Sequence, residues 1–132
     1  MTDQFPRLSR SSPPIRAGIV HRGLGAFFRS HAALIIEDAI KAKGGNWGII
    51  GVSLRSPGIR DSLRPQGNVY TAVEMSPAGP KKRIAEVLSD VVFAPEDPEA
   101  LLVMMADPAI RIVSLTVTEK GYCYIPSSGE LD

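Results

Sequence analysis

Two glycines one residue apart, Gly23 and Gly25, are the residues whose type and spacing most directly suggest chemistry. They follow a short run of β-branched residues and open a segment with helical periodicity. A pyrophosphate can lie against the main chain only where side chains are absent, and the first turn of a helix offers it unpaired N–H groups and a partial positive charge. A strand, a Gly-x-Gly turn and a helix in that order therefore indicate a dinucleotide-binding turn. The alternative is a tight turn without a ligand, because Phe28 occupies the position of the usual third glycine.

The contacts expected at this turn are mainly with backbone atoms, since the glycines offer no side chains. Arg29, one turn into the helix, could contact a phosphate or could simply be a residue of the domain surface. The residues predicted to surround the pyrophosphate are Gly23, Leu24, Gly25, Ala26, Phe27 and Arg29.

The end of the second strand is where an acidic residue would usually bind the ribose diol of NAD. Here Ser53 is followed by Leu-Arg-Ser, and no carboxylate appears before Asp61. Arg55 could meet the 2′-phosphate of NADP or stack on adenine. It could equally be a solvated loop cation. The predicted cofactor is NAD, and NADP stays open.

Further polar residues lie near the expected strand ends. Thr118 and Glu119 follow the last β-branched run, and open α/β sheets bind ligands at the carboxyl ends of their strands. For Glu119 the alternative is a solvated loop acid. His21 and His31 are more simply explained as hydrogen-bonded or packing residues, and without a third ligand at a suitable spacing they predict no metal site.

The elements that must position these residues alternate between strands and helices. Apolar and β-branched runs predict strands, and apolar residues at helical spacing (Phe28, Ala32, Ile35, Ile36 and Ala39) predict a single helix ended by a glycine pair. Asp97 is the expected N-cap of a later helix that begins at Pro98. The predicted strands are 15–20, 47–53, 69–75, 82–88, 91–94 and 110–117, and the predicted helices are 26–43, 56–65 and 98–105.

This order predicts an α/β fold, a three-layer sandwich with a mainly parallel central sheet. The strong turn signal at 76–80 adds a small antiparallel hairpin. The run at 47–53 and the last run are expected to be buried strands, because both are nearly continuous in apolar and β-branched residues.

Composition narrows the classes of function. The 132 residues suit one domain, with residues 1–14 as a flexible or surface-draped leader and 15–132 as the folded part. A net charge of +1 gives no long-range attraction for nucleic acid or an anionic membrane. No apolar run reaches the roughly 20 residues that a membrane span needs. The one cysteine, Cys123, cannot form an internal disulfide, which suggests a cytoplasmic protein.

Three stretches taken together resemble the long-chain mannitol dehydrogenase family, which includes fructuronate (mannonate) and altronate-type oxidoreductases. They are IVHRGLGAFFRSH (19–31), WGIIGVSLRSP (47–57) and SLTVTEKGY (114–122), and the likeness runs from about Ile15 to Tyr122. The family's turn reads Gly-x-Gly-x-Phe-His-Arg-x-His, so the missing third glycine is a family trait. Phe28 departs from it, standing where a histidine is usual.

The resemblance implies a Rossmann-like, partial dinucleotide-binding domain of a two-domain NAD(P)-dependent enzyme. Such enzymes transfer hydride between a secondary alcohol of a polyol or aldonate and nicotinamide, without a metal, and a lysine of a helical C-terminal domain acts as the base. The same resemblance places Thr118 and Glu119 near the nicotinamide end. We expect a fragment that is inactive alone and that self-associates through an uncovered sheet edge. The alternative is a stand-alone nucleotide-binding or interaction module without catalysis.

Overall fold

A parallel sheet of four strands forms the centre of the molecule. The computed structural model describes residues 6–117 and 123–131. The strands are β1 (Ala17–Arg22), β2 (Gly48–Ser53), β5 (Leu88–Phe93) and β6 (Ile112–Leu115), in the order β5-β2-β1-β6, and every pair is parallel. This confirms the predicted fold class. The chain passes from β1 to β2 on one side but later returns to β6 on the other, so the strand order reverses at β1.

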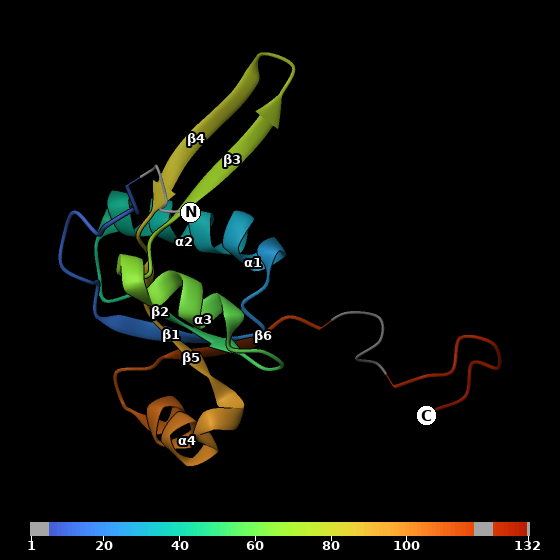
Figure 1. Ribbon diagram of the computed structural model, residues 1–132. Coiled ribbons are helices and arrows are strands. Elements are labelled where there is room, and N and C mark those ends of the chain that lie inside the picture. Colours follow the sequence, from blue (N-terminus) through green and yellow to red (C-terminus); the bar gives the residue numbers. More distant parts are fainter. Residues whose placement is uncertain (1–5, 118–122, 132) are drawn as a thin grey trace.

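Helices cover both faces of the sheet, which makes the three layers visible in Figure 1. On one face lie α1 (Ala26–Ser30), α2 (Ala32–Lys43) and α3 (Gly58–Leu63), the last continued by a 3-10 turn (Arg64–Gln66). On the other face a 3-10 turn (Ala94–Glu96) leads into α4 (Pro98–Ala106). The Asp97 carboxylate accepts a hydrogen bond from the N–H of Ala100 at 2.9 Å, so the predicted N-cap is confirmed.

Two apolar clusters hold these layers together. Ile19, Phe28 and Ile49 belong to the larger cluster, between the sheet and α1 to α3. Val20, Val52 and Leu101 belong to the smaller one, between the sheet and α4. Side chains that follow one another along β1 therefore enter opposite clusters, as the two-residue period of a strand requires.

The prediction of a single helix over 26–43 is wrong. The helix is broken at His31, whose backbone is not helical (φ −128°, ψ −86°). The Ser30 hydroxyl donates to the carbonyl of Ala26 at 2.6 Å, and Nδ1 of His31 lies 3.0 Å from the carbonyl oxygen of Phe27. Side chains of this kind compete with the backbone for helix carbonyls. The break separates the short α1, which starts at the glycine turn, from the longer α2.

The buried face of α2 also differs from the prediction. Ile35 and Ala39 are exposed, whereas Ala33 and Glu37 are buried. The carboxylate of Glu37 accepts hydrogen bonds from Lys41, Arg83 and the N–H of Glu86. Because these donors satisfy the charge, α2 turns an acid toward the body of the protein and leaves Ile35 in solvent.

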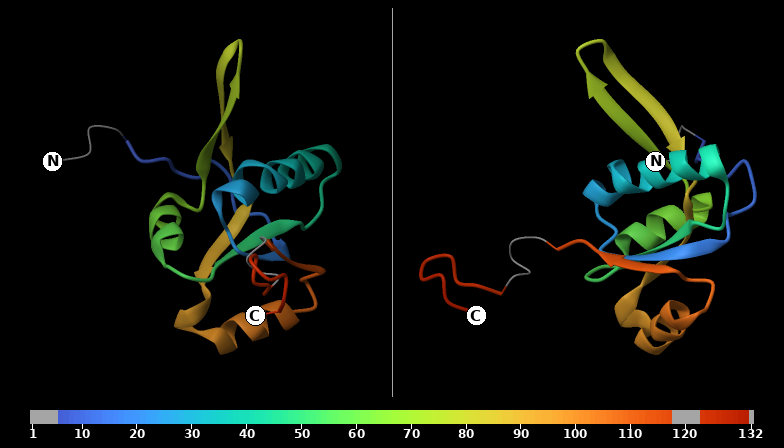
Figure 2. Two further views of the ribbon diagram at one scale, coloured as in Figure 1. Left: turned by 90° about the vertical axis from the view of Figure 1, so that its right-hand side faces the viewer. Right: turned by 180° about the vertical axis from the view of Figure 1, so that it is seen from behind.

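The predicted hairpin is confirmed as β3 (Tyr70–Ser76) and β4 (Gly79–Ala85), an antiparallel pair separate from the main sheet. It rises away from the helical layer, as both views in Figure 2 show. Tyr70, Ala72 and Ala85 are buried at its base, and Met75 near the tip is 77% exposed. Arg83 ties the hairpin to α2 through Glu37 and Asp38.

Arg10 ties the segment before β1 to the body of the protein. Its guanidinium donates to the carbonyls of Gly67, Glu86 and Leu88 at 2.9, 2.8 and 2.5 Å. The backbone N–H of Ser11 donates to the Glu86 carboxylate at 3.0 Å. This part of the expected leader therefore lies along the surface beside the start of β5.

β6 forms an edge of the sheet, and the expectation that it is a buried strand is wrong. Ile112, Val113 and Leu115 are all exposed, because within the described residues β6 pairs with β1 alone. Self-association of the chain through this edge stays a prediction. None of the helices in the described part of the chain is long and apolar enough to cross a membrane.

Candidate dinucleotide site

The candidate site lies at the carboxyl edge of the sheet, where the strand order reverses. β1 ends there at Arg22 and runs into the glycine turn, and β6 ends beside it, with Arg22 paired to Leu115. In open α/β sheets a crevice outside the carboxyl ends of the strands forms at such a reversal. The fold therefore brings together the segments that the sequence placed near a cofactor.

The glycine turn carries the chain from β1 over the end of β2. The N–H groups of Gly23 and Leu24 both donate to the carbonyl of Val52, at 2.9 and 3.2 Å. Gly23 has a φ of +95°, a conformation that residues with a side chain rarely adopt. The N–H of Gly25 then closes back on the carbonyl of Gly23 at 2.8 Å.

Leu24 anchors the turn from below. Its side chain is 3% exposed and lies on β2 at Gly51, where an added Cβ would come within 2.4 Å of a Leu24 methyl carbon. Leu24 can therefore meet a ligand only through its backbone, as expected. The sequence reasoning missed Gly51, and the only available signal was a glycine inside an otherwise continuous apolar strand.

Gly25 forms the mouth of α1. Its backbone is extended (φ −90°, ψ 179°), and no side chain caps the helix. An added Cβ would come no closer than 4.0 Å to its nearest neighbour, the carbonyl oxygen of Gly23. The first N–H groups of a helix lack partners within it. The residues Ala26 and Phe27 are exposed, and no described side chain caps the first turn of α1.

Arg29 lies beside this mouth. Its Nε donates to the carbonyl of Gly25 at 3.3 Å, and its own carbonyl accepts a 2.6 Å hydrogen bond from the hydroxyl of Tyr70. The hydrogen bond to Gly25 thus holds the guanidinium near the N-terminus of α1, where it could contact a phosphate. Because α1 has only five residues, the positive character of the mouth comes from its free N–H groups and Arg29 more than from a long helix dipole.

His21 and Phe28 form the floor behind the turn. The two rings stack with centroids 3.5 Å apart and an interplanar angle of 7°. Nδ1 of His21 lies 2.9 Å from the hydroxyl of Ser114, and Nε2 lies 3.0 Å from that of Thr116. Burial lowers the pKa of His21 below its usual value of 6.5, a shift that the Gly23 carbonyl partly opposes. The histidine is therefore neutral at pH 7, and Phe28 is a core residue that faces away from solvent.

His31 takes a different position. It is exposed at the break between α1 and α2, and its ring stacks on Phe27 with centroids 4.7 Å apart. This agrees with a packing role. No group of three or more His, Cys, Asp or Glu side chains in the described part of the chain could hold a metal ion.

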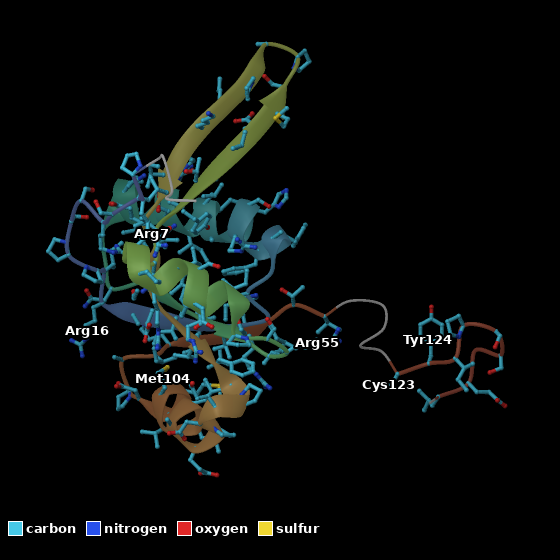
Figure 3. The ribbon with its side chains drawn as sticks, viewed as in Figure 1. Arg7, Arg16, Arg55, Met104, Cys123 and Tyr124 are labelled. Atoms are coloured by element: carbon cyan, nitrogen blue, oxygen red, sulfur yellow. The ribbon has the colours of Figure 1, made fainter. Side chains whose placement is uncertain are left out.

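The end of β2 carries hydroxyl and guanidinium groups. Ser53 is 7% exposed, and its buried hydroxyl has no hydrogen-bond partner among the described residues. Arg55 is exposed at this edge of the sheet, whereas Arg16 lies at the opposite edge (Figure 3). The nearest following acid, Asp61, is paired with Arg60 at 2.9 Å.

Together these features fit an adenine dinucleotide. The start of α1 presents backbone N–H groups that no side chain caps, Arg29 supplies a cation, and the buried hydroxyl of Ser53 at the end of β2 has no partner among the described residues. Thr118 and Glu119, the residues predicted near the nicotinamide, lie outside the described residues. Thr116 is described, and it sits next to the turn: its N–H donates to the carbonyl of Arg22 at 3.2 Å.

Comparison with known proteins agrees with this geometry. The family model of the mannitol dehydrogenase Rossmann domain matches residues 17–131. A mannitol 2-dehydrogenase from Aspergillus niger is 39% identical over 92% of this chain and 26% of its own length. A polyol:NADP oxidoreductase from Gluconobacter oxydans is 41% identical over 89% of this chain and 25% of its own length.

Solved structures of polyol dehydrogenases also match this chain. A Pseudomonas fluorescens mannitol 2-dehydrogenase, in a ternary complex with NAD and D-mannitol, superposes with a TM-score of 0.78 at 39% identity. The match covers 88% of this chain and 24% of that one. A D-sorbitol dehydrogenase in substrate-free form gives the same TM-score and identity over 89% of this chain and 25% of its own. The chain spans about a quarter of the length of these relatives.

Proposed function

This chain belongs to the mannitol dehydrogenase family, and on that premise we propose that it binds a nicotinamide dinucleotide at the carboxyl edge of its sheet. The observation that carries the proposal is the open start of α1, where Gly25 leaves the first N–H groups of the helix without a side-chain cap. The pyrophosphate would lie across Gly23, Gly25, Ala26 and Phe27, held by the first backbone N–H groups of α1, because those of Gly23 and Gly25 already donate within the turn.

The two halves of the cofactor would extend in opposite directions from this point. The adenosine half would lie over the end of β2, near Ser53 and Arg55, and the nicotinamide half over the end of β6, toward Thr118 and Glu119. The relative solved with NAD and D-mannitol, and the one named for a polyol and NADP, support the binding of a nicotinamide dinucleotide.

We propose that the whole protein is an NAD(P)-dependent oxidoreductase of the mannitol 2-dehydrogenase or fructuronate reductase type. When bound, the cofactor would supply the hydride acceptor or donor for the carbinol carbon of a polyol or aldonate. The part described here binds and orients that cofactor. The base would be a lysine of a further domain, as the family resemblance implies, and this chain alone would bind cofactor without oxidising a polyol.

A calorimetric titration of the chain with NADH tests cofactor binding. We expect weak but saturable binding at one site, because the backbone N–H groups of α1 are in place while the chain spans about a quarter of the length of its relatives. Folded protein that shows no heat of binding at millimolar NADH would contradict the proposal.

We propose further that the end of β2 accepts the 2′-phosphate of NADPH. No carboxylate stands between Ser53 and Asp61 to repel it, and the exposed Arg55 can move to meet it. Replacing Arg55 with alanine should weaken NADPH binding by about tenfold, the effect of one hydrogen bond to a charged group. NADH affinity should change much less.

The matched control is Arg16→Ala, since Arg16 is also an exposed arginine but lies at the other edge of the sheet. It should leave both affinities unchanged. If Arg55→Ala leaves the ratio of NADPH to NADH affinity as it is in the unmodified chain, Arg55 has no part in recognising the 2′-phosphate.

A further inference from the structure

His21 joins three elements at the candidate site. It stands on β1 two residues before Gly23, its ring stacks on Phe28 of α1, and its two nitrogens reach the hydroxyls of Ser114 and Thr116 on and just after β6. These hydroxyls lie 93 and 95 residues further along the chain. His21 is thus placed to fix the end of β6 relative to the glycine turn.

Thr116 is the exposed member of this cluster. It follows β6 on the side of the turn away from β2, and its Cβ lies 3.7 Å from the position that a Cβ on Gly23 would take. Thr116 therefore lies directly beside the glycine turn, with its hydroxyl bonded to Nε2 of His21. A ligand group that passes from the turn toward β6 would meet this hydroxyl.

A neutral imidazole has one N–H donor and one acceptor nitrogen. One of its two hydroxyl partners therefore accepts a hydrogen bond from the ring, and the other donates one to it. When Nε2 carries the proton, the Thr116 oxygen accepts from His21 and its own O–H is free to donate to a ligand. When Nδ1 carries it, Thr116 donates to Nε2 and offers a ligand only its lone pairs. The histidine thus determines what Thr116 can offer.

We propose that His21 is a positioning residue for the nicotinamide half of the cofactor, acting through the Thr116 hydroxyl. The stacked, doubly hydrogen-bonded ring holds that hydroxyl in one direction beside the glycine turn. There it hydrogen-bonds the nicotinamide riboside part of the dinucleotide. The inference rests on the proposed cofactor-binding function, which it extends to particular residues on one side of the site.

The test compares two probes, NADH and ADP, because ADP shares the adenosine and the pyrophosphate but lacks the nicotinamide riboside. Thr116→Val, which replaces the hydroxyl with a methyl group, should weaken NADH binding about fivefold, as expected for one hydrogen bond. His21→Phe keeps a ring to stack on Phe28 and should have a similar effect. Neither variant should change ADP affinity appreciably, and Thr116→Ser, which keeps a hydroxyl, should bind NADH nearly as the unmodified chain does.

The double variant makes the inference sharper. If His21 acts through Thr116, then His21→Phe combined with Thr116→Val should bind NADH no more weakly than Thr116→Val alone. Equal losses for NADH and ADP would mean that His21 only supports the fold, and additive losses for NADH would mean that the two residues act separately. If His21→Phe fails to fold, the comparison of Thr116→Val with Thr116→Ser against both probes still decides whether the hydroxyl is used. An unmodified chain that binds neither probe would instead overturn the proposed function.

Discussion

Replacing Gly25 with aspartate is expected to abolish NADH binding without weakening the fold. Gly25 is the N-cap of α1, its backbone angles are open to any residue, and an added Cβ would enter free space. Aspartate is among the preferred N-cap residues, since its carboxylate accepts hydrogen bonds from the first N–H groups of the helix. It would take the donors proposed for the pyrophosphate and place a negative charge beside them.

The loss of two charge-assisted hydrogen bonds alone corresponds to about 100-fold or more in affinity. Thermal unfolding should show a midpoint equal to or above that of the unmodified chain. Gly25→Asn is the matched control for charge, because it fills the same space and caps the same N–H groups while staying neutral, and it should bind NADH better than Gly25→Asp.

A second control separates binding from folding at the same turn. Gly23→Ala places a side chain on a backbone with φ of +95° and should destabilise the chain by about 1–3 kcal/mol. If the turn binds no cofactor, the Gly25→Asp variant should fold and bind NADH as tightly as the unmodified chain does.

Removal of the Glu37 carboxylate is expected to have the largest effect on stability. The side chain is 4% exposed and accepts from Nζ of Lys41 at 2.8 Å, from Arg83 at 2.9 Å and from the N–H of Glu86 at 2.6 Å. Replacing Glu37 with alanine leaves these donors without their acceptor, and should lower the free energy of unfolding by about 3 kcal/mol. Urea unfolding at pH 7 measures this.

The same carboxylate predicts a dependence on pH. Burial alone would raise the pKa of Glu37, but hydrogen bonds from Lys41, Arg83 and the Glu86 N–H outweigh it and hold the pKa below its usual 4.5. The contribution of Glu37 is therefore complete above pH 4.5 and is lost as the pH falls through the lower pKa of the folded state. The difference in stability between the unmodified chain and Glu37→Gln should shrink in that acidic range.

Asp38 supplies the matched control for Glu37. It contacts the same arginine, at 2.8 Å, but its side chain is 61% exposed. Asp38→Asn should change stability little, because exposed ion pairs are screened by water and salt. If Asp38→Asn costs as much as Glu37→Ala, burial does not give Glu37 its importance.

Local patterns predicted those parts of the fold that depend on neighbouring residues. The strand, the glycine turn and the start of α1 were predicted because Gly23 and Gly25 interrupt a β-branched run before a helical one. The cap at Asp97 follows from the Asp-Pro pair. The parallel sheet follows from the alternation of strands and helices, and the hairpin from its turn residues.

The features that the sequence did not predict depend on distant partners. Glu37 is buried because Arg83 of the hairpin and Glu86, just after it, bind its carboxylate from 46 and 49 residues away. β6 has the composition of a buried strand, but among the described residues it pairs with one strand, β1, and its other edge has no partner.

The candidate site likewise has some residues that local sequence patterns predict and others that depend on distant partners. Its glycines could be predicted, since a backbone approach needs residues without side chains. The cluster of His21 with Ser114 and Thr116 could not, because its members come from strands at opposite ends of the chain. The packing of Leu24 on Gly51 was equally hidden, since it depends on how β1 and β2 pair.

The most direct test of the central claim is an NMR titration of the ¹⁵N-labelled chain with NADH. We expect the amide signals of Gly23, Gly25, Ala26 and Phe27 to move together and to saturate with one dissociation constant, because the N–H groups of Ala26 and Phe27 would receive the pyrophosphate and Gly23 and Gly25 form the turn beside it. If these signals stay in place at millimolar NADH while the spectrum remains that of a folded protein, the glycine turn is a purely structural turn that binds no cofactor.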